Sequence, residues 1–99
     1  MGYAACGDYR LRRLEQQMQA IYSELLTQVS RPVEGRNSQR TRDALRKSQA
    51  AWARSASADC ELADTLPGTG NASAGIAVDC HTDGVRARIA FLKSLKGHL

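Results

Sequence analysis

Three stretches with helical spacing of apolar side chains follow one another along the chain. In the first, apolar residues recur every three or four positions, which is typical of one buried face of a helix. The positions are Leu11, Leu14, Met18, Ile21, Tyr22, Leu25, Leu26 and Val29. Asp8 stands where a carboxylate can satisfy free backbone amides, and Pro32 disfavours helix at the residue before it. The pattern predicts a helix over residues 8–30, after a flexible start at residues 1–7.

The second stretch follows a short polar linker, residues 32–37. Asn37 or Ser38 can cap a helix here, and Pro67 ends it near Leu66. Alanine is abundant in this stretch, which favours helix intrinsically. The positions expected to face inward are Leu45, Gln49, Trp52, Ala56, Cys60 and Ala63.

The third stretch comes after residues 67–73, which are rich in turn-forming residues. It predicts a helix over residues 74–96. Gly84 costs about 1 kcal/mol of helix propensity, so we expect it to allow a close neighbour or to mark a bend. Gly97 fits a C-terminal cap. The positions expected to face inward are Ile76, Cys80, Val85, Ile89, Leu92 and Leu95.

Three helices joined by short loops predict an all-α fold, a small antiparallel bundle that forms one domain over residues 1–99. An antiparallel hairpin brings Cys60, near the end of the second helix, close to Cys80, near the start of the third. We predict a disulfide between them, worth about 3 kcal/mol for a loop of this size. The alternative is two buried free thiols in a cytosolic bundle, whereas paired cysteines in a small domain are typical of oxidising compartments. Cys6 has no obvious partner within the chain.

Composition is that of an ordinary soluble domain, with 42% apolar and 24% charged residues. No apolar run reaches the roughly 20 residues that cross a bilayer. Fourteen basic and ten acidic residues give a net charge of +4, which suits nucleic acid, anionic lipid or an acidic protein face. The basic residues are dispersed, and no aromatic residues or recognition motif accompany them. We therefore expect a solvated surface and no nucleic-acid partner.

No motif for catalysis, a metal or a cofactor is recognised. The cysteines form no C-x-x-C pair, and the glycines form no phosphate-binding loop. His81 follows Cys80, but the predicted disulfide occupies that thiol, so His81 is expected to be an exposed helix residue. The protein is therefore expected to be non-enzymatic and to hold neither cofactor nor metal.

Gln49 and Trp52 form a polar–aromatic pair on the second helix. We expect Trp52 to fill the bundle and Gln49 to bond to backbone or to the indole N–H. Contact with a ligand is the alternative.

The order and spacing of several residues resemble a known family. Leu45-x-x-x-Gln49-x-x-Trp52 is followed by Cys60, a glycine-containing loop, Cys80 and then Arg88-Ile89-x-x-Leu92. This series resembles the lysozyme inhibitor LprI-like domain family. The start of this chain also resembles the first helix of the family. The matching residues are Ala5-Cys6-Gly7-Asp8, followed by Leu11, Leu14 and Tyr22. The family commonly has Arg-Asp where this chain has Ala56 and Ser57.

The resemblance implies an exported protein, periplasmic or attached to the bacterial cell envelope, whose signal would lie upstream of Met1. It also implies a protein partner, with lysozyme as the candidate, and we expect a monomer. One alternative is an envelope lipoprotein or interaction module without an enzyme target, for which an anionic membrane surface is a candidate partner. Another is a cytosolic helical regulator that binds nucleic acid.

Charge constrains where lysozyme would be contacted. Lysozymes are often basic and would be repelled by a net charge of +4, so inhibition needs a local acidic patch or an inserted loop. The candidate contacts are Asp59, Glu61 and Asp64, otherwise expected to be a solvated face, and the loop residues Gly68, Thr69, Gly70 and Asn71.

The family also suggests a role for Cys6, because its members often carry a further cysteine upstream. Cys6 would then pair with a cysteine that precedes this segment. One alternative is lipid modification, since Ala4, Ala5 and Gly7 are the small residues that a lipoprotein cleavage site needs. A free thiol is the other.

Overall fold

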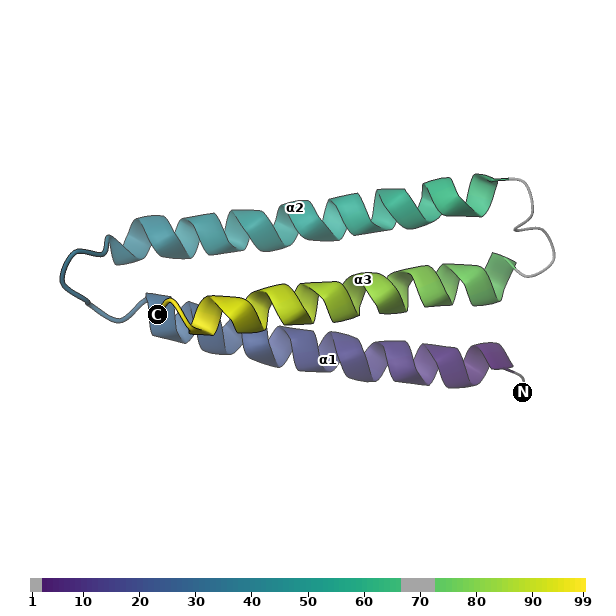
Figure 1. Cartoon of the computed structure of the whole chain (residues 1–99), viewed down its shortest axis with the longest axis horizontal. Coiled ribbons are helices and arrows are strands. Elements are labelled where there is room, and N and C mark those ends of the chain that lie inside the picture. Colours follow the sequence, from purple (N-terminus) through teal and green to yellow (C-terminus); the bar gives the residue numbers. More distant parts are fainter. Residues whose placement is uncertain (1–2, 67–72) are drawn as a thin grey trace.

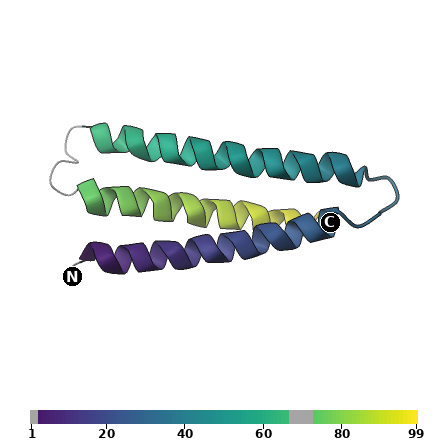
Figure 2. The ribbon, with the colours of Figure 1, turned by 180° about the vertical axis from the view of Figure 1, so that it is seen from behind.

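The computed structural model describes the backbone of residues 3–66 and 73–99 and the side chains of residues 9–66 and 79–99. Within these ranges the chain forms three helices, α1 (Tyr3–Val29), α2 (Ser38–Thr65) and α3 (Ser73–Lys96). Consecutive helices run antiparallel, so α1 and α3 point the same way, and α3 lies between α1 and α2 in both views (Figures 1 and 2). The predicted all-α bundle of three helices is confirmed.

The predicted bounds of α2 and α3 agree with the structure to within one or two residues, whereas α1 starts earlier than predicted. It begins at Tyr3 and not at Asp8, so residues 3–7, expected to be a flexible start, have helical backbone. Ala4 and Ala5 favour helix and no proline interrupts the segment, which outweighs the cost of Gly7. Asp8 is therefore inside the helix and does not cap it.

Asn37 is the N-cap of α2, one of the two predicted candidates. Its backbone is extended, and its side-chain Oδ1 accepts a hydrogen bond from the backbone N–H of Arg40 at 3.0 Å. The Thr41 hydroxyl donates to the Asn37 carbonyl at 3.1 Å. At the other end, the backbone N–H of Leu66 donates to the carbonyl of Ala63 at 3.3 Å. Both ends of α2 thus satisfy backbone groups that a helix leaves free.

The linker between α1 and α2 folds back onto the end of α1. Arg36 Nη2 donates to the carbonyl oxygens of Gln28, at 3.1 Å, and of Arg31, at 2.8 Å. The Ser38 hydroxyl also donates to Arg31 O at 3.0 Å. Gly35 has a φ of 81°, a left-handed conformation that side chains disfavour. These bonds fasten the linker to the last turn of α1 and fix where α2 begins.

The core lies mainly between α1 and α3. Its buried apolar residues occupy predicted inward positions and are Met18, Ile21, Leu25, Val29, Leu45, Val85, Ile89 and Leu92. Leu25 and Leu92 are the most deeply buried, with 1% and 0% exposed surface. From α2 only Leu45 and Cys60 are buried, and the other predicted inward positions are half-buried. The side chain of Ile76 lies outside the described residues.

Cys60 and Cys80 form the predicted disulfide, with their Cα atoms 5.7 Å apart. It joins the C-terminal part of α2 to the N-terminal part of α3. Because α2 buries so little apolar surface, this covalent bond supplies one of the contacts that hold α2 on the bundle. Cys6 lies in the first turns of α1, and its side chain is outside the described ones.

The structure contradicts the close neighbour expected at Gly84 and the cap expected at Gly97. α3 runs through Gly84, and no neighbouring atom lies within 4 Å of the place where a Cβ would stand, so this glycine does not serve a close approach. Gly97 follows the last residue of α3 but does not adopt the left-handed conformation of a glycine cap. Instead, the backbone N–H of His98 bonds to the carbonyl of Leu95 at 3.0 Å in a further turn.

Candidate functional site

Arg88, a residue of the family's motif series, connects α2 and α3. It was expected on the solvated basic surface, yet it is buried between α2 and α3 with 8% of its surface exposed. Its Nε donates to Gln49 Oε1 and its Nη2 donates to Ser48 Oγ, both at 2.9 Å. Gln49 therefore pairs with a guanidinium, and not with backbone or the indole N–H as expected. Both residues interrupt apolar stripes, which indicates that each lies on an inward face, although the sequence does not show that they meet.

Two aromatic rings complete the surroundings of Arg88. The guanidinium carbon lies 4.8 Å from the ring centre of Phe91 and 5.8 Å from that of Trp52, within the range of cation–π attraction. Among the described side chains, no carboxylate forms an ion pair with Arg88; the ion pair that joins α1 and α3, Lys96 with Glu24, lies elsewhere. Burial lowers the pKa of Arg88, which nevertheless stays protonated. The Arg88 cluster is defined here as Arg88, Gln49, Ser48, Trp52 and Phe91.

The Arg88 cluster unites residues that are 39 and 40 positions apart in the sequence. The three apolar residues of the same motif series, Leu45, Ile89 and Leu92, lie in the core. The motif residues therefore hold α2 and α3 together, and the arrangement is that of a structural cross-link.

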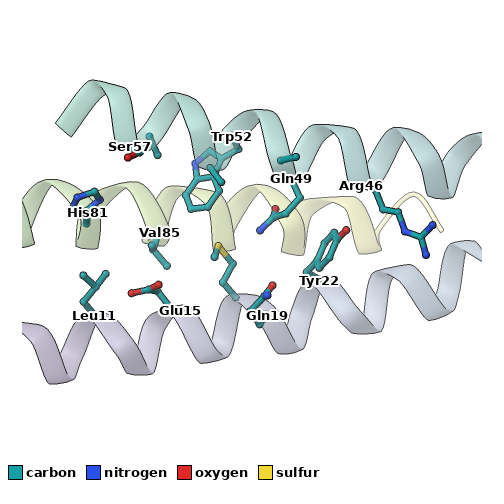
Figure 3. Close-up of a pocket in the computed structure, with 14 residues that line it drawn as sticks. Leu11, Glu15, Gln19, Tyr22, Arg46, Gln49, Trp52, Ser57, His81 and Val85 are labelled. Carbon is teal, nitrogen blue, oxygen red and sulfur yellow. The ribbon is translucent and has the colours of Figure 1, made fainter. Parts of the chain in front are cut away.

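A groove opens between α1 and α2, with α3 behind it (Figure 3). Its volume is about 640 Å³. Leu11 and Tyr22 reach into it from α1, and Trp52 from α2 (Figure 3). Met18 and Val85, both buried, also line it. Trp52 is thus half-buried at the edge of the core and does not fill the bundle as expected.

Polar side chains border this groove. They include Glu15 on α1 and His81 on α3. His81 is half-buried, and not exposed as expected, because it stands on the side of α3 that faces the groove. In the described part of the chain, no three His, Cys, Asp or Glu side chains gather where they could hold a metal ion. What the groove offers is apolar contact surface with polar groups at its rim.

The end of the α2–α3 hairpin is acidic, although the whole chain is basic. Residues 55–85 contain five acidic residues and no lysine or arginine, so the rest of the chain holds all fourteen basic residues and five acidic ones. The five are exposed at the disulfide end of the bundle and are Asp59, Glu61, Asp64, Asp79 and Asp83. We name this surface the acidic hairpin end. Sequence reasoning singled out three of the five but not the lack of lysine and arginine in residues 55–85. The loop candidates Gly68, Thr69, Gly70 and Asn71 lie outside the described residues.

The fold and these contacts define the class of protein, a small antiparallel bundle of three helices with a disulfide and a buried arginine cross-link between two of them. The model of one family, described as lysozyme inhibitor LprI, matches residues 1–92. The chain therefore belongs to the lysozyme inhibitor LprI family. No curated protein and no solved structure gives a significant match. None of the described helices is long and apolar enough to cross a membrane.

Proposed function

We propose that this protein is an exported, non-enzymatic binding protein of the bacterial cell envelope that inhibits lysozyme. Membership of the lysozyme inhibitor LprI family, over residues 1–92, is the observation that carries the proposal. The Cys60–Cys80 disulfide supports export, because structural disulfides persist in oxidising compartments such as the periplasm.

The acidic hairpin end is the proposed contact surface for lysozyme. A basic enzyme is repelled by the net charge of +4 but attracted by the five carboxylates of residues 55–85, a segment that contains no lysine or arginine. The disulfide holds the two helices of this surface together, so little order would be lost on binding. The loop residues 68–71 join the two helices and are the proposed segment that enters the enzyme's cleft.

A lysis assay tests the proposal. Purified protein is added to lysozyme and a suspension of bacterial cell walls, and the fall in turbidity is followed. We expect slower lysis that approaches full inhibition at excess protein. Unchanged lysis at excess protein would exclude lysozyme as the target and would favour an envelope interaction module, whose partner a pull-down from envelope extract would identify.

Two triple variants with equal changes of charge locate the contact. The first, Asp59→Asn/Glu61→Gln/Asp64→Asn, removes three carboxylates of the acidic hairpin end. The second, Glu24→Gln/Glu34→Gln/Asp43→Asn, removes three exposed carboxylates near the opposite end. We expect the first to weaken inhibition roughly tenfold at low salt, since opposed charges set the association rate, and the second to change it little. Equal losses in both would mean that only net charge matters and that the hairpin is not the contact.

A further inference from the structure

The end of the bundle opposite the disulfide is strongly basic. Residues 28–42 and 93–99 together contain six lysines and arginines and one acidic residue, Glu34. The basic residues are Arg31, Arg36, Arg40, Arg42, Lys93 and Lys96. The end of α1, the start of α2 and the end of α3 meet here (Figures 1 and 2). Glu24, bonded to Lys96 at 2.8 Å, and the exposed Asp43 border this surface without being part of it.

An exposed apolar side chain stands among these cations. Val33, with 51% of its surface exposed, lies in the loop that projects beyond the ends of α1 and α3 (Figure 1). Together with Arg31, Arg36 and Lys96 it lines a shallow pocket of about 240 Å³. Arg36 Nη2 is occupied by backbone carbonyls and Arg36 Nε is buried, whereas Arg31, Arg40, Lys93 and Lys96 are exposed. We name this surface, the six basic residues with Val33, the basic end.

We propose that the basic end docks on a membrane surface that is rich in anionic phospholipid. The exposed Arg31, Arg40 and Lys93 would contact headgroup phosphates, and Val33 would enter the boundary between headgroups and acyl chains. Positive charge alone would equally suit nucleic acid or another polyanion. Val33 favours lipid, because an exposed apolar side chain beside basic residues gains nothing from a phosphate backbone but is removed from water at a bilayer.

Docking at this end would orient the molecule. The bundle is elongated, with extents of 55 × 25 × 16 Å, and the acidic hairpin end lies at its far end (Figure 1). Carboxylates repelled by anionic lipid would therefore point away from the membrane. The inference does not depend on lysozyme inhibition, since it uses residues at the other end of the bundle.

Sedimentation of the full chain with lipid vesicles tests the inference. The probes are vesicles of phosphatidylcholine alone and of phosphatidylcholine mixed with phosphatidylglycerol. We expect binding to the mixed vesicles only, weakening as salt is added, because exposed charges are screened. Equal binding to both vesicle types, or to neither, would overturn the inference.

Two triple variants separate docking by the basic end from attraction by net charge. Arg31→Gln/Arg40→Gln/Lys93→Gln removes three charges from the basic end, and Arg10→Gln/Arg12→Gln/Arg54→Gln removes three exposed charges from the other half of the bundle. At about fivefold per basic residue near the lipid, the first should weaken binding about a hundredfold, and the second only slightly. Equal losses would overturn the inference. Circular dichroism checks that both variants stay helical, and Arg31→Gln alone provides a milder change.

Val33→Ser tests the apolar contact at constant net charge. We expect about fivefold weaker binding to the mixed vesicles, because the side chain no longer gains from leaving water. Unchanged binding would show that charge alone acts, and equally tight binding to duplex DNA would then assign the surface to polyanions.

Competition with inorganic phosphate is the last experiment. Release of the protein by millimolar phosphate would identify a site for free phosphate, and no release is expected for a membrane surface.

Discussion

Arg88 Nε donates a hydrogen bond to Gln49 Oε1 at 2.9 Å, across the seam between α2 and α3. A second bond, from Arg88 Nη2 to Ser48 Oγ, has the same length. A buried cation needs partners, and here they are neutral oxygens and two aromatic rings instead of a carboxylate. Because α2 buries so few apolar side chains, we conclude that this contact sets the position of α2 along α3.

Removing either partner should therefore destabilise the protein by more than a surface change would. We expect Gln49→Ala to lower the free energy of unfolding by about 1–3 kcal/mol, because a buried charge loses an acceptor. Arg88→Lys should cost a similar amount, since an ammonium group cannot reproduce the forked pair of bonds. Urea unfolding followed by circular dichroism measures both. In a double-mutant cycle of Gln49→Ala and Arg88→Ala we expect coupling of about 1 kcal/mol, and strictly additive losses would contradict a direct interaction.

The disulfide should contribute as much to the stability of the fold as any other contact of α2. Cys60 and Cys80 are separated by 20 residues, and closing a loop of that length is worth about 3 kcal/mol in the chain-entropy model. We expect Cys60→Ala/Cys80→Ala to lower the free energy of unfolding by about this amount. Both proteins are compared in a Cys6→Ser background, which prevents exchange with the third thiol. A melting temperature that does not change on reduction of the parent would argue against the bond.

Replacing glycine by alanine should change the stability in opposite directions at Gly84 and Gly35. Gly84 lies within α3, and a Cβ added there would have no neighbouring atom within 4 Å. Gly84→Ala should therefore stabilise the protein by about 0.5–1 kcal/mol. At Gly35 the φ of 81° disfavours a side chain, so Gly35→Ala should destabilise it by about 1 kcal/mol. Chemical denaturation of both variants and the parent measures the two changes. Changes of the same sign would mean that the backbone at one position differs from that described.

A pair of leucines tests the location of the core. Leu92 is completely buried in the core, whereas Leu62 on α2 is 61% exposed. We expect Leu92→Ala to cost about 2–5 kcal/mol, since it leaves a cavity. Leu62→Ala should stay within about 0.5 kcal/mol of the parent. The comparison uses thermal unfolding, and a large loss at Leu62 would reveal a surface that is buried in an assembly.

The sequence by itself determined most of the architecture. Apolar residues at helical spacing identified α2 and α3, because burial of one face is what stabilises each helix in water. Capping and turn-forming residues gave their bounds. The start of α1 was missed, since Asp8 resembles a cap whereas alanines carry the helix back to Tyr3. The pairing of Cys60 with Cys80 followed from topology alone, as a hairpin leaves them few other neighbours.

What only the tertiary structure decided is where polar groups meet. Arg88 is indistinguishable by composition from the exposed arginines, and its burial follows from the packing of α3 between two helices. The groove exists because α2 packs on α3 while standing away from α1, which no periodicity within one helix reveals. The charge pattern can be read in the sequence, but its placement depends on the tertiary arrangement, which brings residues 55–85 to one end and the basic residues of 28–42 and 93–99 together at the other. Helical periodicity is a local property, whereas contacts between helices depend on how their faces are oriented in space.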